Sequence, residues 1–426
     1  MTAEHPEQAE TADVAIVGAG PAGLTAAACL RRLTGARVVV IDREAEPGGI
    51  PRHAHHQGFG LRDLRASLTG PEYAKRLADR ADRAGAVIRS RAQATGWSPD
   101  GALELTSPAG RTELLARAVV LATGCRERPR SARLVAGSRP DGVMTTGTLQ
   151  QLVYLAKRSP GRRAVVVGAE HVSFSALATL EHGGARAVAM VTELPRHQSF
   201  ALFRLGASLR YRTPLLTGTA ITAIHGRPRV QAVELTELAT GATRTLECDT
   251  VVFTAGWVPD HELAVLGGLT LDPATRGPRV DGGLRTARSG LFAAGNVVHP
   301  AETADVAALA GRHVAATVQA ALEDRAPWPA AAAPLICEAP LHWVAPSAVS
   351  PGPLAGPPRG RYLLRAHREL IDAGVEMVQD GRALGRHRAV RVTAGRSTAL
   401  PAAVTARADP DGGAISVRVV SARCRR

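Results

Sequence analysis

A glycine-rich turn near the N-terminus has the residue types and spacing that bind a dinucleotide. Gly18, Gly20 and Gly23 match the pattern G-x-G-x-x-G, with Pro21 and Ala22 before the third glycine. The first glycine permits a tight turn, the second lets a pyrophosphate approach the backbone, and the third allows close helix–strand packing. The N–H groups at the start of the following helix would attract the phosphates. This turn therefore predicts a dinucleotide-binding site.

A carboxylate in the expected place supports that prediction. Residues 37–41 form a second short apolar run, and Asp42 and Arg43 follow it. A carboxylate at the end of the second strand commonly bonds to the ribose hydroxyls of the nucleotide. The order of strand, turn, helix and strand predicts a βαβ unit.

A second turn of the same kind begins at Gly168, after the apolar run 164–167. Here Glu170 and Ser173 stand in place of the second and third glycines. Glu170 would bring negative charge to the place where a pyrophosphate approaches, and like charges in contact are costly. Glu193, at the end of the next apolar run, could still bond to an NAD ribose. Two interpretations stay open, a working NAD(P) site and an inherited fold with a closed site, and the substitutions favour the closed site.

The two turns require parallel sheets to position them. The predicted fold is α/β, with two Rossmann-like dinucleotide-binding domains, the second inserted in the first, and a small β-rich C-terminal domain. We expect a flexible tail at 1–11, a first dinucleotide-binding domain at 12–135 and 280–325, a second such domain at 136–279, a Pro/Gly/Ala-rich linker at 326–360 and the β-rich domain at 361–426.

Composition argues against several other classes of protein. The net charge is +14, but nearly all of the positive charge is arginine spread along the chain, so we expect no nucleic-acid partner. No apolar run of about 18 residues predicts a membrane-spanning helix, and the polar N-terminus does not resemble a signal peptide. The five cysteines form no Cys-x-x-Cys pair, which argues against an iron–sulfur or dithiol centre. Scattered thiols suit a reducing, cytoplasmic setting.

Four elements, in order, resemble the pyridine-nucleotide–disulfide oxidoreductase superfamily of flavoproteins. They are the turn at 18–23, Gly48-Gly49, Ala122-Thr123-Gly124, and Gly295-Asn296 after the run 291–294. The resemblance implies an FAD cofactor. It also implies these site residues: Gly18, Gly20, Pro21, Ala22, Gly23, Asp42, Arg43, Gly48, Gly49, Ala94, Thr123, Gly124, Gly295, Asn296 and Thr303.

The resemblance implies a particular role for three of these positions. Ala94 would meet the adenine through its backbone. Asn296 stands where the family usually has an aspartate that bonds to the flavin ribityl chain, and an amide can still donate and accept hydrogen bonds. The start of the helix near Thr303 would stabilise the anionic reduced flavin.

The segments 48–60 and 142–149 resemble a narrower group of flavoproteins. It holds the FAD subunits of dye-linked amino-acid dehydrogenases, opine oxidases and hydrogen cyanide synthase, and the flavoproteins that accompany glycerol-3-phosphate-dehydrogenase-like proteins. In this interpretation segment 48–60 lies along the isoalloxazine, with Arg52 and His56 near the ring. The three histidines His53, His55 and His56 lack accompanying ligands of suitable spacing, so no metal is predicted.

We therefore expect an FAD-dependent oxidoreductase, the flavoprotein subunit of a multi-subunit dehydrogenase or oxidase. Its small-molecule substrate would be an amine, an amino acid, a hydroxy acid or a polyol phosphate, and a second flavoprotein subunit would be its partner. The alternatives are a free-standing NAD(P)H-dependent flavin reductase and a non-catalytic FAD-binding subunit.

Overall fold

The computed structural model describes residues 10–199, 205, 209–352 and 354–421. The chain divides into two compact units. Unit 1 comprises Met1–Arg52, Gly58–Cys125 and Pro259–Arg426, and unit 2 comprises His53–Gln57 and Arg126–Val258. The first strand begins at Glu10, so the expected tail at 1–11 is too long at its end, and its residues 1–9 lie outside the described residues.

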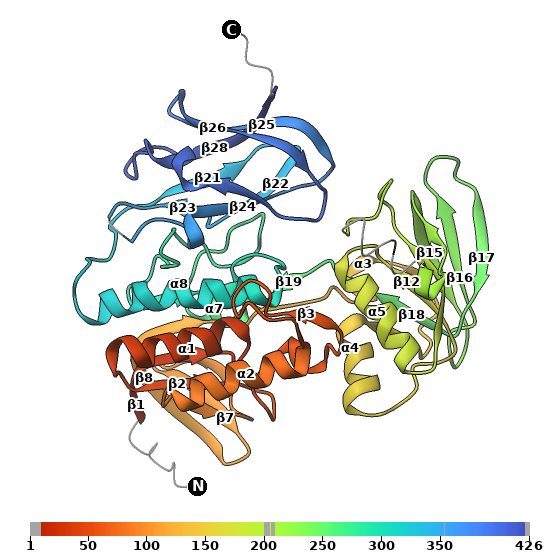
Figure 1. The fold of residues 1–426 in the computed structure, drawn as a ribbon, viewed down its shortest axis with the longest axis horizontal. Coiled ribbons are helices and arrows are strands. Elements are labelled where there is room, and N and C mark those ends of the chain that lie inside the picture. The colour runs from red at the N-terminus through yellow and green to blue at the C-terminus, as the bar shows by residue number, and fades with distance from the viewer. Residues whose placement is uncertain (1–9, 200–204, 206–208, 353, 422–426) are drawn as a thin grey trace. The chain divides into compact units, whose positions relative to one another are not determined.

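Unit 1 is built on a seven-stranded sheet in the order β5-β2-β1-β8-β7-β6, with β20 beside β8 (Figure 1). Strands β5, β2, β1, β8 and β20 run parallel, while β6 and β7 form an antiparallel extension. The central strands are continuous apolar runs because both faces of the sheet are covered. The bounds are β1 (Glu10–Val17), β2 (Val38–Ile41), β5 (Val87–Arg89), β6 (Gln93–Trp97), β7 (Leu103–Ser107), β8 (Gly110–Leu121) and β20 (Leu291–Ala293).

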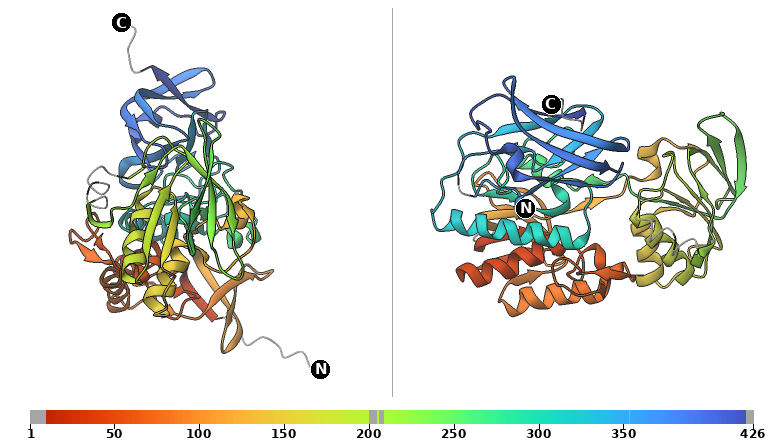
Figure 2. Two further views of the ribbon diagram at one scale, coloured as in Figure 1. Left: turned by 90° about the vertical axis from the view of Figure 1, so that its right-hand side faces the viewer. Right: turned by 45° about the horizontal axis from the view of Figure 1, so that its top comes forward.

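Helices α1 (Pro21–Thr34), α2 (Gly70–Arg83) and α8 (Ala304–Leu322) accompany this sheet. Figures 1 and 2 both show α8 running alongside α1. The approach is very close, because a Cβ atom at Gly311 of α8 would lie 2.0 Å from the Ala22 carbonyl oxygen of α1. Helix α8 therefore brings the segment before it next to the start of α1.

Unit 2 has a five-stranded parallel sheet, β11-β18-β12-β13-β14, and a four-stranded sheet, β10-β15-β16-β17. The second sheet, largely antiparallel, was not predicted from the sequence. Its elements are α3 (Arg130–Arg133), β10 (Ala136–Gly137), β11 (Val143–Thr145), α4 (Thr146–Gln150), η2 (Gln151–Leu155), β12 (Arg163–Val167), α5 (His171–His182), β13 (Arg186–Val191), β14 (Leu215–Leu216), β15 (Thr219–His225), β16 (Ala232–Glu237), β17 (Thr243–Glu247) and β18 (Thr250–Phe253).

The predicted second domain at 136–279 extends too far. The chain returns to unit 1 at Pro259, and the short helix α7 (Glu262–Leu266) packs on β6. The indole of Trp97 donates a hydrogen bond of 2.9 Å to the Leu263 carbonyl oxygen, which holds α7 in place. Other short elements of the chain are η1 (Ile50–His53), β3 (Gln57–Phe59), β4 (Leu68–Thr69), β9 (Cys125–Arg126), β19 (Val258–Pro259) and η3 (Gly295–Val297).

The C-terminal part of unit 1 contains a five-stranded sheet, β23-β21-β28-β25-β26, and a three-stranded sheet, β22-β24-β27. The predicted linker at 326–360 is wrong, because three of these strands lie within it. Prolines 334, 340 and 346 lie at the ends of short strands, where a missing N–H is tolerated. The bounds are β21 (Ala333–Cys337), β22 (Leu341–Ala345), β23 (Ala348–Val349), η4 (Pro358–Gly360), β24 (Arg361–Ala366), β25 (Leu370–Gln379), β26 (Arg382–Val392), β27 (Thr398–Pro401), η5 (Ala402–Thr405) and β28 (Ile415–Ser421).

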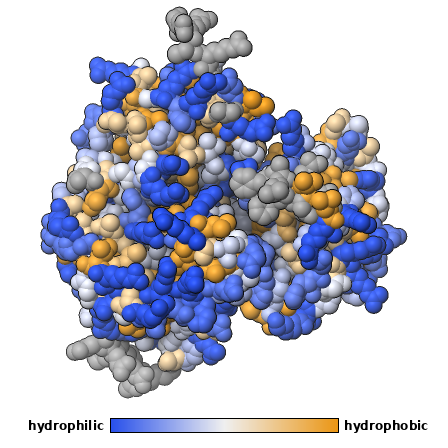
Figure 3. All heavy atoms as spheres, viewed as in Figure 1, coloured by the Kyte–Doolittle hydropathy of each residue, from blue (hydrophilic) through white to orange (hydrophobic). Residues whose placement is uncertain are grey.

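Two Rossmann-like α/β sheets and a β-rich C-terminal region confirm the predicted fold class. On the face shown in Figure 3, hydrophilic and hydrophobic residues are mixed in small patches. Among the described residues, no helix is both long and apolar enough to cross a membrane. Within the same residues, no cluster of three or more His, Cys, Asp or Glu side chains could hold a metal ion.

Candidate functional site

The first glycine turn leaves no room for side chains at two of its three glycines. Gly18 has a φ of 109°, and a Cβ there would lie 2.4 Å from the Ala122 carbonyl oxygen. A Cβ at Gly23 would lie 1.9 Å from the Gly18 carbonyl oxygen. Gly20 differs, because a Cβ there would meet nothing within 4 Å. The space beside Gly20 is therefore open, as the approach of a pyrophosphate requires.

The start of helix α1 faces this open space. Gly20 is the N-cap and Pro21 follows it, and none of the described side chains caps the first turn. The N–H groups of that turn and the partial positive charge of the helix are available to an anion. Helix and turn thus form a cradle for phosphate groups.

Asp42 closes one side of the turn. Its Oδ2 accepts a hydrogen bond of 2.6 Å from the Ala19 N–H, and its Oδ1 accepts one of 2.8 Å from the Glu44 N–H. Burial raises the pKa of the Asp42 carboxyl, although these two bonds lower it. A carboxylate has about four acceptor positions, so two stay open for ribose hydroxyls. The neighbouring Arg43 is exposed and pairs with Asp260 at 3.2 Å.

Three further glycine segments meet at the same turn. The Gly48 N–H donates a hydrogen bond of 2.8 Å to the Ala19 carbonyl oxygen. A Cβ at Gly49 would lie 2.9 Å from the Gly20 Cα, and one at Gly295 would lie 2.8 Å from the Ala22 Cβ. Ala122 packs on Gly18, and Thr123 follows it in the chain. The Thr123 hydroxyl donates a hydrogen bond of 2.7 Å to the Asp260 carbonyl oxygen. The backbone conformation of Gly124, with a φ of 78°, suits glycine. The four motifs of the sequence thus come together in space.

Ala94 lies beyond the residues whose backbone bonds to Asp42. It is part of β6 and pairs with Leu105 of β7. The Asp42 backbone instead bonds to Arg89, whose carbonyl oxygen accepts from the Asp42 N–H at 2.8 Å, and to Ala92, whose N–H donates to the Asp42 carbonyl oxygen at 2.9 Å.

Arg52 and His56 are placed differently from each other. Arg52 belongs to unit 1, where its Nη1 donates to the Glu46 carbonyl oxygen at 2.5 Å and its Nη2 pairs with Glu44 at 3.6 Å. His56 belongs to unit 2, is exposed, and has its Nδ1 2.9 Å from the Gln57 carbonyl oxygen. The neighbouring His55 ring stacks on Tyr154 with centroids 3.9 Å apart.

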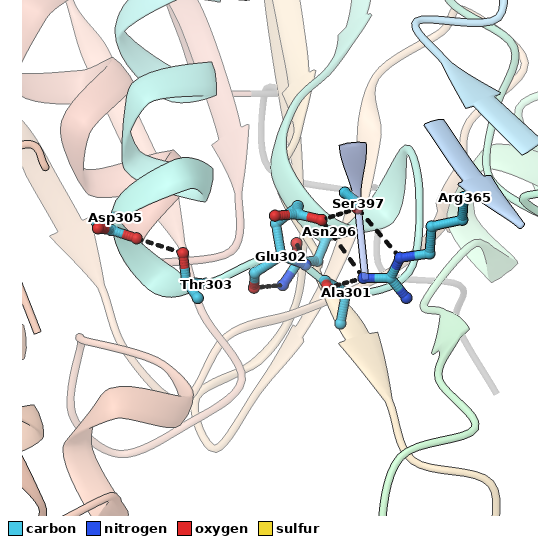
Figure 4. A network of polar contacts seen from close by, with 7 residues as sticks. All are labelled: Asn296, Ala301, Glu302, Thr303, Asp305, Arg365 and Ser397. Atoms are coloured by element: carbon cyan, nitrogen blue, oxygen red, sulfur yellow. Dashed lines mark hydrogen bonds and ion pairs between the residues drawn. The ribbon is translucent and has the colours of Figure 1, made fainter. Parts of the chain in front are cut away.

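The side chain of Asn296 is held by the backbone of Glu302 (Figure 4). Its Nδ2 donates to the Glu302 carbonyl oxygen at 3.1 Å, and its Oδ1 accepts from the Glu302 N–H at 2.9 Å. This pair of bonds closes the loop between Gly295 and helix α8. Thr303 is the N-cap of α8, and its hydroxyl bonds to the Asp305 carboxylate. Asp305 also accepts from the Val306 N–H at 3.0 Å and so occupies part of the helix start.

The second glycine turn is filled by the chain itself. The Glu170 N–H donates to the Ser173 hydroxyl at 3.1 Å, and that hydroxyl bonds to Glu170 Oε2 at 3.0 Å. The Thr254 hydroxyl lies 3.2 Å from the same Oε2 and 2.7 Å from the Ser173 oxygen. The Glu170 carboxylate therefore lies at the start of helix α5, the position that a dinucleotide phosphate takes in an open turn.

Two charged residues support the walls of this second turn. Arg133 donates to the carbonyl oxygens of Thr254 and Ala255 at 2.7 and 2.6 Å, and desolvation lowers its pKa although Glu170 raises it. Glu127 accepts from the Gly147 N–H at 2.8 Å, and burial raises its pKa. Glu193 is exposed just after β13. Of these residues, the sequence predicted only Glu193. A local signal for Thr254 was present in the sequence. Thr254-Ala255-Gly256 follows the apolar run 250–253, as Ala122-Thr123-Gly124 follows an apolar run in the first domain.

Comparisons with known proteins agree with this geometry. Residues 12–321 match the family described as pyridine nucleotide-disulphide oxidoreductase. An opine oxidase subunit of Rhizobium meliloti is 29% identical over 316 residues, which cover 67% of this chain and 58% of that protein. The matched part of the chain thus spans little more than half of that relative. Thioredoxin reductase of Treponema pallidum is 29% identical over 296 residues, covering 67% of this chain and 88% of the relative.

A solved structure shows the same fold. The thioredoxin reductase of T. acidophilum superposes with a TM-score of 0.61 at 22% identity, covering 74% of this chain and 99% of that protein. At 22% identity this likeness concerns the fold alone.

The residues of the first turn fit FAD. An open space at Gly20, an uncapped helix start, and a carboxylate with spare acceptor positions supply what a pyrophosphate and a ribose need. The second turn does not offer the same fit, because its own carboxylate occupies the start of the helix. The chain belongs to the pyridine nucleotide-disulphide oxidoreductase family and is an FAD-dependent oxidoreductase.

Proposed function

We propose that this chain is the FAD-binding subunit of a multi-subunit dehydrogenase or oxidase that takes electrons from a small organic substrate. The substrate would be an amine, an amino acid, a hydroxy acid or a polyol phosphate. One observation carries the proposal: the first glycine turn is open, whereas the second is filled by Glu170. Electrons would then enter from a substrate rather than from NAD(P)H. The likeness to one subunit of an opine oxidase supports such a role for this chain.

We propose that the FAD is held by the residues around the first turn. The pyrophosphate would lie against Gly20 and the start of α1, and Asp42 would bond to the adenosine ribose. FAD supplies a ring that accepts two electrons, and the protein positions and tunes it. The full set proposed is Gly18, Gly20, Pro21, Ala22, Gly23, Asp42, Arg43, Gly48, Gly49, Ala94, Thr123, Gly124, Gly295, Asn296 and Thr303.

Arg52 is the better supported of the two residues proposed near the flavin ring. Its Nε is buried and has no hydrogen-bond partner in the described part of the chain. An unpaired buried N–H is costly, so a carbonyl oxygen of the ring would stabilise it. Such a positive group beside the ring would favour the anionic reduced flavin. His56 keeps the same proposed role.

We propose that a second flavoprotein subunit carries the substrate site and that the complex works in the cytoplasm. The match covers 58% of an opine oxidase relative whose name describes it as one subunit of its enzyme, and this supports a partner subunit for the present chain. The thiols of Cys29, Cys248 and Cys337 suit a reducing compartment.

An anaerobic titration of the purified flavoprotein tests the proposal. The oxidised flavin is mixed with NADH, NADPH, and a panel of amines, amino acids, hydroxy acids and polyol phosphates, with and without the co-purified partner. We expect bleaching of the flavin absorbance by one class of organic substrate in the complex, and none by NADH or NADPH. Rapid bleaching of the isolated chain by NADH would contradict it.

A second candidate is a free-standing NAD(P)H-dependent reductase. It is favoured by the likeness to thioredoxin reductase, of which the match covers 88%. This candidate needs the Glu170 carboxylate to move away from the start of α5 before a dinucleotide can bind. The same titration separates the two, because only this candidate predicts bleaching by a reduced nicotinamide.

A further inference from the structure

The C-terminal β-rich region reaches the expected flavin site through one arginine. Arg365 lies on β24, outside the residues 12–321 that match the family. Its Nη2 donates to the Ala301 carbonyl oxygen at 2.5 Å and lies 3.4 Å from Glu302 Oε1. Figure 4 shows this side chain reaching from the neighbouring strand to the loop that precedes α8. The contact thus joins the added region to the dinucleotide-binding fold.

The arginine is itself held in a fixed orientation. Its guanidinium lies over the Trp343 ring, 5.1 Å from the centroid, and its Nε donates to the Ser397 hydroxyl at 3.1 Å. That hydroxyl bonds in turn to the Glu302 carboxylate. The side chains of Arg365 and Glu302 are each only 13% exposed, so this ion pair is screened less than a surface pair. Loss of either partner would leave a largely buried charge without its partner.

The loop that Arg365 contacts, residues 296–303, follows directly after Gly295, one of the glycines expected at the FAD. Glu302 uses its backbone N–H and carbonyl to bind both ends of the Asn296 amide. Asn296 follows Gly295, which packs on Ala22 at the start of α1. A shift at Glu302 would therefore move Asn296, the residue expected at the ribityl chain.

We propose that Arg365 is a positioning residue for FAD, and that the C-terminal region serves to fix the loop 296–303 at the flavin through it. This inference rests on FAD binding at the first turn and on no particular substrate. Arg365 also compensates the Glu302 carboxylate, and loss of the guanidinium would leave that negative charge unpaired on the flavin side of the site, which disfavours the reduced, more negative flavin. The C-terminal region is then part of the cofactor site rather than an independent appendage.

Substitution of Arg365 tests the proposal without any substrate. We compare R365Q and R365K with R388Q, because Arg388 lies in the same region and pairs with Asp372 on the surface. The readouts are the dissociation constant of FAD with the apoprotein and the midpoint potential of the bound flavin. We expect about tenfold weaker FAD binding and a more negative potential in R365Q. R365K should recover part of both, and R388Q should match the unaltered protein.

A second variant guards against a folding defect. S397A removes one partner of Arg365 and of Glu302 while keeping both charges. If R365Q does not fold, a weaker FAD affinity and a shifted potential in folded S397A support the proposal, and unchanged values overturn it. R365Q that folds and equals R388Q in both readouts also overturns it. The proposed dehydrogenase function fails separately, if no organic substrate reduces the flavin of the unaltered complex.

Discussion

Gly18 and Gly168 each follow a buried parallel strand, and their φ angles are 109° and 136°. Beyond them the two turns differ in what occupies the start of the helix. Beside Gly20 there is open space, whereas Glu170 places one oxygen of its own carboxylate within hydrogen-bond distance of both the Ser173 and the Thr254 hydroxyl. The same backbone plan thus has an open helix start in one unit and a helix start occupied by an acidic side chain in the other. The internal carboxylate satisfies the helix start as a phosphate would.

The largest effect should come from filling the open turn. Gly20→Ala adds a methyl group where the pyrophosphate approaches, yet Gly20 has an extended φ of −82° and nothing within 4 Å of the added atom. We expect about 100-fold weaker FAD binding with an unchanged free energy of unfolding of the apoprotein. Isothermal titration and chemical denaturation measure the two quantities. The control is G356A, another position where an added Cβ would meet nothing.

One outcome would contradict this prediction. FAD bound to G20A as tightly as to G356A would place the pyrophosphate elsewhere and end the comparison between the two turns.

The next effect should come from emptying the filled turn. The double substitution of Glu170→Gly and Ser173→Gly removes the carboxylate and its hydroxyl partner. We expect the affinity for NADH to rise about 30-fold, because like-charge contact with the pyrophosphate is lost. The free energy of unfolding should fall by about 2 kcal/mol, since glycine weakens a helix start that a side chain capped. Fluorescence quenching by NADH measures binding, with E181Q at the far end of α5 as the control.

A folded double variant that still binds no NADH would show that the closure lies outside these two residues. Thr254 and the arginine-held backbone behind it would then be the next positions to test.

A smaller effect is expected at Asp42. Asp42→Asn keeps the shape but replaces one acceptor oxygen with a donor, so we expect about fivefold weaker FAD binding. Burial raises the pKa of Asp42, so the folded apoprotein holds this proton more tightly than the unfolded chain does. The resulting stability is fully present below about pH 3.9 and is lost as the pH rises through the raised native pKa.

The asparagine variant should lack that decline. Apoprotein unfolding is measured across the acid range for both proteins. Parallel curves would mean that Asp42 titrates alike in the folded and unfolded states.

The smallest effect is expected at Arg43. Its side chain is 59% exposed and pairs with Asp260 at the surface. Arg43→Gln should weaken FAD binding about twofold at low salt, because exposed ion pairs contribute little. The difference should vanish at high salt, where surface charges are screened. A larger loss that persists in high salt would assign Arg43 a direct contact with a phosphate.

Patterns within short stretches of sequence predicted the individual strands and helices of the two dinucleotide-binding folds. The apolar runs 37–41, 164–167 and 291–294 correctly located β2, β12 and β20, and the helix expected near Thr303 is α8. Prolines misled the prediction at 326–360, because proline is common both in linkers and at the ends of short strands. The contacts of Ala301 and Glu302 with Arg365 had no local signal at all, because Arg365 lies on a strand of a separate sheet.

The order of the chain has a consequence for how the molecule is made. The main segment of unit 2, Arg126–Val258, is continuous, whereas unit 1 needs β20 and α8 from beyond it to complete the sheet and the turn. During synthesis, unit 2 can fold as soon as its main segment leaves the ribosome. Unit 1 must wait for Gly295 and α8 before its FAD cradle exists, so cofactor capture would be a late event. A nascent chain truncated before β20 should contain a folded unit 2 and no bound flavin.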